Sequence, residues 1–401
     1  MNTHPTPEAI SHSQRICFVA PFGLRLKGTV RARILPLARG LAQRGHEVML
    51  LIPPWDSPED AGKGWEDGGV RIVNVSVKGG LLPTLGRMVA EIRGFGPDIL
   101  HIVKPRAHAG LIQWLIWHFP SLAGRQTLCI FLDIDDWEQA WEDVAGYSWP
   151  LARFLAWQEE WGIRHAHGIT AASRWLEMRV DDYAPTTPVL YLPNGVTVDD
   201  APIRPRQTAL GAPPTLLLFS RFIEVDPAWM GKFWTAMQKK VPNVHLIVAG
   251  QAIQPHHEEA MRIVIDSSTT PSTPSTPPKV TWLGYVDPPT LTAAIEGADC
   301  AIFPAADLPL NQAKCSVRLA TLLMAGLPVV ASAVGEQIGY GGGGAARLVD
   351  ADASPADFAQ AVADLLLAPQ DRIALAAKAR RHLADRYDWE KLGEILNDFY
   401  A

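Results

Sequence analysis

The sequence is poor in the features that mark disulfide-rich, membrane-spanning and nucleic-acid-binding proteins. It has only four cysteines in 401 residues, scattered without a CxxC pair, which argues against a disulfide framework or a cysteine-based metal site. It has no run of about eighteen apolar residues, so a membrane-spanning helix is not expected. Basic residues do not outnumber acidic ones, and the net charge of −6 argues against a general nucleic-acid-binding protein.

The composition that is present indicates a folded globular protein. Hydrophobic residues make up 48% of the chain and charged residues 19%, which is typical of a packed domain. We interpret the cysteines as small buried residues in a reducing, cytoplasmic compartment, and residues 1–14 as a disordered tail without signal-peptide character. The fourteen tryptophans are attributed mainly to core packing. The alternative is a patch that binds an acceptor or the inner face of a membrane.

Short apolar runs alternate with amphipathic segments almost throughout the chain. In the first half, strands are predicted at 16–20, 47–52, 70–77, 98–104, 129–134, 168–172 and 189–193, with helices at 30–44, 85–93 and 107–117. In the second half, strands are predicted at 215–219, 244–250, 279–284, 300–305 and 327–332, with helices at 227–240, 255–265, 288–297 and 313–325. Continuous apolar strands separated by helices predict parallel sheets covered on both faces.

The alternation is interrupted by a proline-rich stretch at 199–214, which we interpret as an interdomain linker. The fold class is therefore α/β, with two Rossmann-like, doubly wound domains at 15–198 and 215–385 and a final segment at 386–401. The segment 267–278 is of low complexity and is expected to be an exposed loop. Ligands collect at the carboxyl ends of parallel strands, so two such domains would face a cleft.

Two cations stand at the start of the predicted helix 313–325, for which Asn311 is a candidate cap. Lys314 and Arg318 lie one turn apart, and the macrodipole disfavours positive side chains there by roughly 0.3–1 kcal/mol each. A bound anion would reverse this penalty, and Ser316 would add a hydroxyl. The alternative is that both side chains extend into solvent. Spacings of three and four residues also place Val317 on the buried face of this helix.

The same segment carries a resemblance to a known family. KCSVRLATLLMAGLPVVAS, preceded by DCAIFPAADLPLNQA, resembles the nucleotide-sugar-binding segment of family 4 glycosyltransferases of the GT-B fold. Seven further segments are similar to family segments in the same order: KGTVRARILPLARGLAQRGHEVMLL, DILHIV, YLPNGV, LLLFSRF, VHLIVAG, VTWLGYV and YDWEKLGEILNDFY. The resemblance implies that the second domain holds a nucleotide-sugar and the first an acceptor. It also implies that the last helix crosses back to pack on the first domain.

The resemblance implies donor-binding residues in the second domain. Arg221 matches the family arginine that contacts the donor diphosphate, whereas Asp226 stands about where the family has a lysine. The family's pair of glutamates falls at Ala313 and Thr321, so both carboxylates are missing and only the Thr321 hydroxyl could reach a ribose. Lys314, Ser316, Val317 and Arg318 resemble a subset pattern in which cations face the donor phosphates.

In the first domain, the loop PFGLRLKGT at 21–29 corresponds to the family's glycine loop. Gly23 and Gly28 would let a ligand approach the backbone, and cations add positive charge there: Arg25, Lys27, Arg31 and Arg33. The alternative is a solvated surface loop. Asn194 and Gly195 match the family's Asn-Gly turn, for which a turn-forming role without ligand contact is the favoured interpretation.

The segment LDIDDWE at 132–138 ends an apolar strand, so Asp133, Asp135 and Asp136 are expected at the cleft. One of them could accept a hydrogen bond or a proton from an acceptor hydroxyl. Capping of the next loop is the alternative, and metal binding is not expected.

The preferred hypothesis is a metal-independent glycosyltransferase without further cofactors. It would move a sugar from a nucleoside-diphosphate sugar to a hydroxyl of a glycan, lipid or small molecule, with retention of configuration implied by the resemblance. Charge stabilisation of the departing diphosphate would supply the catalysis. The missing carboxylates motivate two rivals, a catalytically weak relative that acts as a binding protein and a sugar-nucleotide epimerase.

Overall fold

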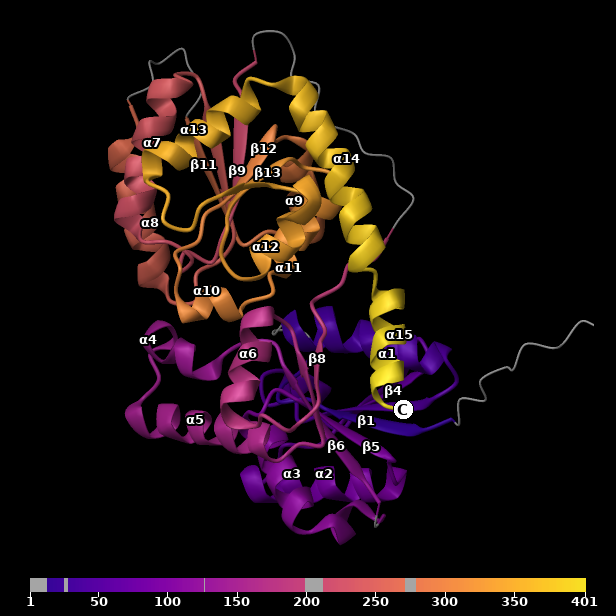
Figure 1. Ribbon diagram of the computed structural model, residues 1–401. Helices are drawn as coiled ribbons and strands as arrows, with labels where there is room; N and C mark the ends of the chain where they lie inside the picture. Colours follow the sequence, from indigo (N-terminus) through magenta and orange to yellow (C-terminus); the bar gives the residue numbers. More distant parts are fainter. Residues whose placement is uncertain (1–12, 25–27, 126, 199–211, 271–278) are drawn as a thin grey trace, which may run out of the picture.

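The computed structural model describes residues 13–24, 28–125, 127–198, 212–270 and 279–401, which form two α/β units stacked on each other (Figure 1). The predicted linker and low-complexity loop lie largely outside these residues, as does almost all of the predicted tail. Among the described residues, no helix is both long enough and apolar enough to span a bilayer.

The first unit is built on a sheet with the strand order β3-β4-β2-β1-β5-β6-β7-β8. Its strands are β1 Arg15–Val19, β2 Glu47–Ile52, β3 Gly64–Asp67, β4 Val70–Asn74, β5 Ile99–Val103, β6 Cys129–Ile134, β7 Gly168–Ala171 and β8 Val189–Tyr191. The neighbouring strands are parallel, except that β3 pairs antiparallel with β4 at the sheet edge. Our prediction of a purely parallel sheet missed this hairpin, because β3 is a short and mostly exposed strand without an apolar run.

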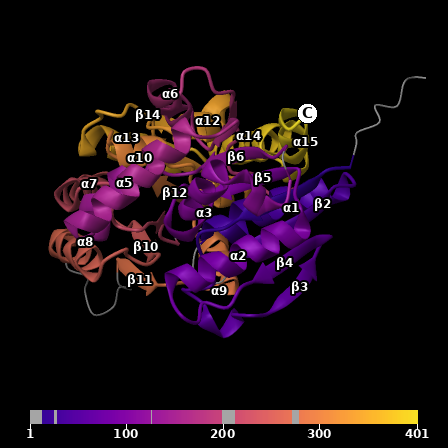
Figure 2. The same ribbon diagram turned by 90° about the horizontal axis from the view of Figure 1, so that it is seen from below.

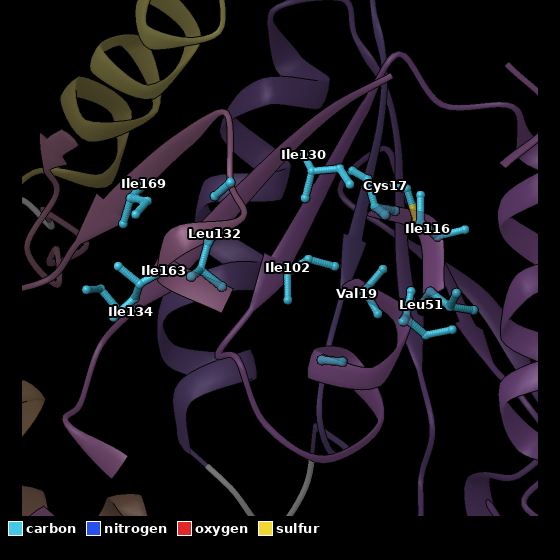
Figure 3. Close-up of a cluster of buried hydrophobic side chains, with 14 of the residues drawn as sticks. Cys17, Val19, Leu51, Ile102, Ile116, Ile130, Leu132, Ile134, Ile163 and Ile169 are labelled. Atoms are coloured by element: carbon cyan, nitrogen blue, oxygen red, sulfur yellow. The ribbon is translucent and has the colours of Figure 1, made fainter. Parts of the chain in front are cut away.

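Helices cover both faces of this sheet. They are α1 Leu35–Gln43, α2 Leu81–Phe95, α3 Ala107–His118, α4 Glu142–Ala145, α5 Trp149–Arg164 and α6 Arg174–Tyr183, with short helical turns at Val30–Ile34, Pro58–Asp60, Pro120–Ala123 and Glu138–Trp141. One core lies between the sheet and the layer that contains α2 and α3 (Figure 3). Because both faces are covered, the central strands are apolar throughout, as the sequence indicated.

The second unit has the doubly wound strand order β11-β10-β9-β12-β13-β14. The strands are β9 Thr215–Phe219, β10 His245–Ala249, β11 Val280–Gly284, β12 Cys300–Phe303, β13 Val329–Ser332 and β14 Arg347–Val349. The helices are α7 Pro227–Lys240, α8 Pro255–Ser268, α9 Pro288–Glu296, α10 Pro309–Ala313, α11 Val317–Met324, α12 Glu336–Gly341, α13 Pro355–Leu366, α14 Pro369–Arg386 and α15 Trp389–Phe399, with a helical turn at Gly342–Gly344.

The end of the chain returns to the first unit. Helix α15 packs against α1, and Leu392 and Leu396 enter the core formed by the first sheet and α1. Helix α15 therefore lies below α14 in Figure 1 and joins the two units from outside the cleft. The cysteines differ from expectation at one position, since Cys17, Cys300 and Cys315 are buried but Cys129 is exposed.

Candidate active site

A buried ion pair occupies the carboxyl edge of the first sheet. The Arg33 guanidinium donates to both carboxylate oxygens of Asp133, at 2.9 Å from Nε and 2.6 Å from Nη2, and Thr170 Oγ1 donates to the same carboxylate at 2.6 Å. Arg33 and Asp133 side chains are both 1% exposed. Burial alone would raise the pKa of Asp133, but Arg33 holds it below the usual value. Arg33 and Asp133, both predicted as site residues, therefore form an ion pair with each other.

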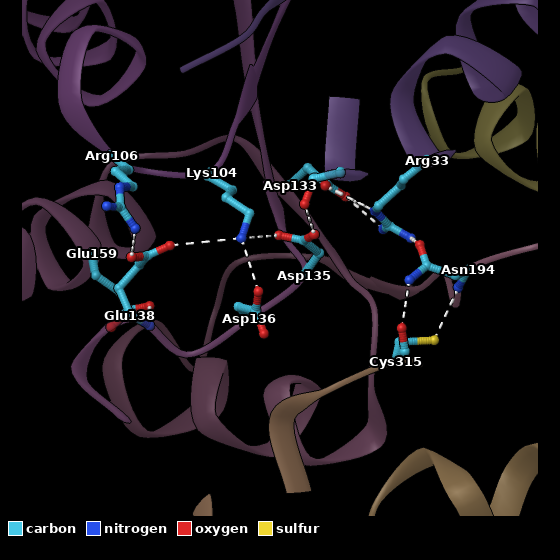
Figure 4. Close-up of polar contacts among 11 residues, drawn as sticks. Arg33, Lys104, Arg106, Asp133, Asp135, Asp136, Glu138, Glu159, Asn194 and Cys315 are labelled. Carbon is cyan, nitrogen blue, oxygen red and sulfur yellow. Dashed lines mark hydrogen bonds and ion pairs between the residues drawn. The ribbon is translucent and has the colours of Figure 1, made fainter. Parts of the chain in front are cut away.

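A second network surrounds Lys104, which follows β5 in a left-handed backbone conformation with φ of 57°. Its ammonium lies 2.9 Å from Asp135 and 3.0 Å from Asp136 (Figure 4). Thr29 Oγ1 also donates to Asp135 at 2.8 Å, yet burial raises the pKa of Asp135 to about 6. The Asp135 side chain is 7% exposed and that of Asp136 19%. Asp136 is thus the more accessible carboxylate of this pair.

The glycine loop is only partly described, because residues 25–27, with Arg25 and Lys27, lie outside the described residues. The Gly23 N–H donates to Asp56 Oδ1 at 2.7 Å, and a Cβ at this position would meet Ser57 Oγ at 2.2 Å. A Cβ on Gly28 would instead meet open space. Gly23 is therefore needed for packing of its own loop, whereas Gly28 leaves room beside the cleft.

Asn194 connects the two units. Its side chain accepts from Arg33 Nη1 at 3.3 Å and donates from Nδ2 to the Cys315 carbonyl at 2.7 Å (Figure 4). Tyr340 donates its hydroxyl to the Asn194 carbonyl at 2.6 Å. A Cβ on Gly195 would meet the Trp389 ring at 2.6 Å. Arg33, Asp133 and Asn194 therefore form one buried chain of contacts that fixes the position of Cys315.

The predicted helix 313–325 is wrong in its first part, because the structure divides it into α10 and α11. Ser316 is the cap of α11, and its hydroxyl accepts from the Leu319 N–H at 3.4 Å. Asn311 is not a cap, since its amide donates to the carbonyls of Glu224 and Ala306. Lys314 thus lies in an extended connector before the helix, where the bonds from Asn194 to Cys315 hold the chain.

Glu224, which lies between β9 and α7, belongs to this region but was not predicted from the sequence. Its buried carboxylate accepts from Ser220 Oγ at 2.8 Å and from the Arg221 N–H at 3.2 Å, and it forms an ion pair with Arg318. Burial alone would raise the pKa of Glu224, but Arg318 and Lys314 lower it well below the usual value. The available signal was a carboxylate three residues after Arg221 in the apolar run FIEV.

Arg318 and Arg221 stand on either side of this carboxylate. Arg318 also donates from Nη1 to the Phe219 carbonyl at 3.0 Å. The Arg221 side chain is exposed, and partial desolvation and repulsion by Arg318 lower its pKa. Within the described part of the chain, no side-chain partner of Arg221 is found. One arginine is therefore fixed by Glu224 while the other is free to meet a ligand.

Lys314 completes the cluster from the connector. Its ammonium nitrogen is buried without a hydrogen-bond partner among the described residues, and it lies 4.8 Å from the centre of the Trp141 ring of the first unit. The pKa of Lys314 is lowered to about 8, mainly by burial and in smaller part by Arg318 and Arg221, whereas Glu224 and Asp136 oppose the shift. Burying a cation without a hydrogen bond raises the free energy of the folded protein. This position therefore favours a bound anion.

A cavity of about 700 Å³ lies between α11 and residues of the first unit. Its walls include Gly195 and Val196 from the first unit and Val317, Thr321 and Met324 from α11. Val317 is 38% exposed, so our placement of this residue on the buried face is wrong. The Thr321 hydroxyl donates to the Val317 carbonyl at 2.9 Å. Val317 and Thr321 therefore line the cavity, whereas Arg221, Lys314 and Arg318 are not among its lining residues.

Comparison with known proteins identifies the class to which this arrangement belongs. The description "Glycosyltransferase Family 4" matches residues 30–200, and "Glycosyl transferases group 1" matches residues 213–383. A phosphatidyl-myo-inositol mannosyltransferase of Mycolicibacterium smegmatis is 27% identical across 96% of this chain and 93% of its own length.

Solved structures of low sequence identity share the fold. Sucrose-phosphate synthase from Thermosynechococcus elongatus has a TM-score of 0.70 at 17% identity, covering 96% of this chain and 98% of its own. HepE from Anabaena, solved with UDP and glucose, has a TM-score of 0.65 at 15% identity, covering 96% and 99%.

The fold is GT-B, with two parallel-sheet α/β units on either side of a cleft. The chain belongs to the family 4 type of GT-B glycosyltransferases and is an enzyme with glycosyltransferase activity. The rival hypothesis of an inactive relative is not favoured. The family's glutamate positions are occupied by Ala313, which is fully buried, and by Thr321 at the cavity.

Proposed function

We propose that the enzyme transfers a sugar from a nucleoside-diphosphate sugar to an acceptor hydroxyl, with retention of anomeric configuration. The donor diphosphate would lie among Arg221, Lys314 and Arg318, and the nucleoside would enter the cavity beside Val317 and Thr321. HepE, which shares the fold, was solved with UDP-glucose, and this supports a nucleotide-sugar as donor.

The observation that carries the proposal is the unbalanced charge at Lys314. Three cations meet around a single buried carboxylate, Glu224, and the Lys314 ammonium has no hydrogen-bond partner among the described residues. A diphosphate bound there would receive charge-assisted hydrogen bonds in a partly desolvated site. The same groups would stabilise the negative charge that develops on the leaving diphosphate as the bond to the sugar breaks.

The carboxylates of the first domain would face the acceptor. Asp136 is the candidate for contact with the acceptor hydroxyl, because it is the more exposed of the two partners of Lys104. Asp133 and Asp135 would act as positioning residues that hold Arg33 and Lys104. We propose that no metal ion is required, since cations of the chain already neutralise these carboxylates.

Calorimetric titration with UDP and GDP, followed by a screen of sugar nucleotides for release of nucleoside diphosphate, tests the proposal. Lys314→Met should weaken binding of the preferred diphosphate by about 10–100-fold, the value of one charge-assisted hydrogen bond. Lys232→Met, an exposed lysine of α7, is the matched control and should bind as the wild type does. Failure of both nucleotides to bind, or equal binding by both variants, would refute the proposed donor site.

A further inference from the structure

Helices α3 and α5 of the first domain have an inverted polarity, with their polar side chains directed inward. Gln113 of α3 is buried, and its amide donates to the carbonyls of Gly162 and His165 at 2.9 and 3.0 Å. Glu159 of α5 is also buried and accepts from the Glu138 N–H at 2.7 Å. Burial and the nearby Glu138 raise the pKa of Glu159 to about 8, so this carboxyl is largely neutral at pH 7. Gln113 and Glu159 are thus used inside the protein.

The outward side of the same helices is aromatic. Trp149 is 71% exposed, and Phe154 and Trp157 are also exposed. Ring contacts of 5.8 Å from Phe154 to Trp157 and 6.3 Å from Trp157 to Trp161 continue along α5. Contacts of 5.6 Å from Trp161 to His118 and 4.5 Å from His118 to Trp114 carry the surface onto α3. We call this surface the aromatic face; it comprises Trp114, His118, Trp149, Phe154, Trp157 and Trp161.

The aromatic face refines our interpretation of the tryptophans. Core packing accounts for eight of the fourteen: Trp137, Trp141 and Trp234 are buried, and Trp117, Trp175, Trp229, Trp282 and Trp389 pack partly buried against the cores. The tryptophans of the aromatic face are not among them. Large apolar side chains gathered on one exposed surface mark an interaction site. Tryptophan in particular favours the interface between lipid and water, where its ring is buried and its N–H stays hydrated.

The charge of this side of the molecule differs from that of the whole chain. Figure 2 shows α2, α3 and α5 side by side on one face, and α3 is in contact with both of the others. Helix α3 has no charged residue other than histidine. The remaining ionisable residues of α2 and α5, apart from buried Glu159, are the arginines and glutamates Arg87, Arg93, Arg153, Arg164, Glu91 and Glu160. In these three helices the arginines therefore outnumber the glutamates other than Glu159 by four to two, in a chain of net charge −6.

We propose that the aromatic face docks on the surface of a bilayer that contains anionic phospholipid. The rings would enter the interfacial region, as in helices that lie in the membrane plane, and the arginines would be attracted by the lipid phosphates. In a two-fold dimer the same arginine-bearing face would meet itself and be repelled, so the excess of arginine over glutamate favours an anionic membrane over a second copy of this chain. The docking itself does not depend on the donor site.

The position of α5 gives this docking a consequence for the acceptor, which rests on the proposed function. Tyr147, two residues before α5, accepts from Arg106 Nη2 at 3.0 Å, and Arg106 lies in the loop after β5 together with Lys104. A docked enzyme would thus hold the acceptor side of its cleft near lipid headgroups. The acceptor class that fits is a hydroxyl of a membrane lipid.

Co-sedimentation of the full chain with vesicles tests the proposal. The wild type should sediment with vesicles of phosphatidylcholine mixed with phosphatidylglycerol, and less with phosphatidylcholine alone or at high salt. The double variant Trp149→Ser/Trp157→Ser should partition at least about tenfold more weakly because two interfacial rings are lost. The control Ile263→Ser/Leu367→Ser removes two exposed apolar side chains of the second domain and should sediment as the wild type does.

Three outcomes would overturn the proposal: no sedimentation of the wild type with either lipid, equal sedimentation of the tryptophan variant, or equal sedimentation with both lipids. A wild-type dimer in light scattering that the tryptophan variant dissociates would assign the face to a second copy and also overturn it. UDP and GDP titrations of the same variants separate this question from the donor site. Normal nucleotide binding without sedimentation refutes the docking alone, and sedimentation without nucleotide binding refutes the proposed function alone.

Discussion

The two domains place charged residues at equivalent edges of their sheets, but only in the first domain is each cation of the charge network paired with a carboxylate. There, Arg33 is paired with Asp133, Lys104 with Asp135 and Asp136, and Arg106 with Glu138. In the second domain, Arg221, Lys314 and Arg318 surround the single carboxylate of Glu224. A balanced network is a scaffold, since both partners are already satisfied, whereas an excess of one charge favours a ligand of the opposite charge.

Breaking the balanced network should have the largest effect. Asp133→Asn leaves the Arg33 charge buried without a counter-ion and should lower the free energy of unfolding by about 3–5 kcal/mol. Urea unfolding monitored by circular dichroism measures this. Asp67→Asn, which removes the partner of half-exposed Arg39, is the control and should cost at most about 1 kcal/mol. A loss below 1 kcal/mol for Asp133→Asn would show that this pair is not a scaffold.

Removing a cation from the cluster of Arg221, Lys314 and Arg318 should instead raise the free energy of unfolding. The folded protein lowers the pKa of Lys314 from 10.5 to about 8, so the unfolded chain binds more protons between these values and stability rises with pH there. At pH 7 the full penalty applies, and Lys314→Met should stabilise the ligand-free protein by up to about 3 kcal/mol. Urea unfolding at pH 7 without nucleotide checks this, and destabilisation would contradict the role assigned to this lysine.

Arg221 should matter for binding more than for stability, because its side chain is exposed and forms no hydrogen bond or ion pair with another described side chain. Arg221→Met should weaken nucleoside-diphosphate binding about tenfold, which is 1.4 kcal/mol, and leave the unfolding midpoint nearly unchanged. Calorimetry and urea unfolding of the same preparation measure both. Arg381→Met, an exposed arginine of α14, should change neither quantity. A stability loss without a loss of affinity would place Arg221 with the scaffold.

The smallest expected effect is the pH dependence of binding. Lys314 loses its charge above its pKa of about 8, and a bound diphosphate favours the charged form. Diphosphate affinity should therefore fall about fourfold between pH 7 and pH 8.5. Lys314→Arg keeps its charge over this range and should show a flatter profile in calorimetric titrations. Parallel profiles for both proteins would mean that another group titrates.

The sequence predicted the units of the fold better than the contacts between them. The strands at 47–52, 129–134 and 215–219 and the helix at 227–240 have the predicted bounds, because apolar runs and caps such as Asp226 are local signals. The break between α10 and α11 was missed, since Asn194, which holds the connector, is distant in the sequence. The β3 hairpin was missed because an exposed edge strand has no apolar run.

The site was predicted in its residue types but not in its pairings. The cations Lys314 and Arg318 were recognised from their cost at a helix start, although the structure places only Arg318 in the helix. The sequence did not reveal that Arg33 is used by Asp133 or that Glu224 holds Arg318, because both pairings are made by tertiary structure. The sequence thus shows which charged side chains are present, and tertiary packing determines which of them are free to bind a ligand.

The most direct test of the unbalanced cluster is a crystal structure with whichever of UDP and GDP binds more tightly. The account predicts diphosphate oxygens within hydrogen-bonding distance of Lys314 Nζ, with the Arg221 guanidinium turned toward the same group. A diphosphate bound elsewhere, with the Lys314 ammonium still against the Trp141 ring, would contradict it.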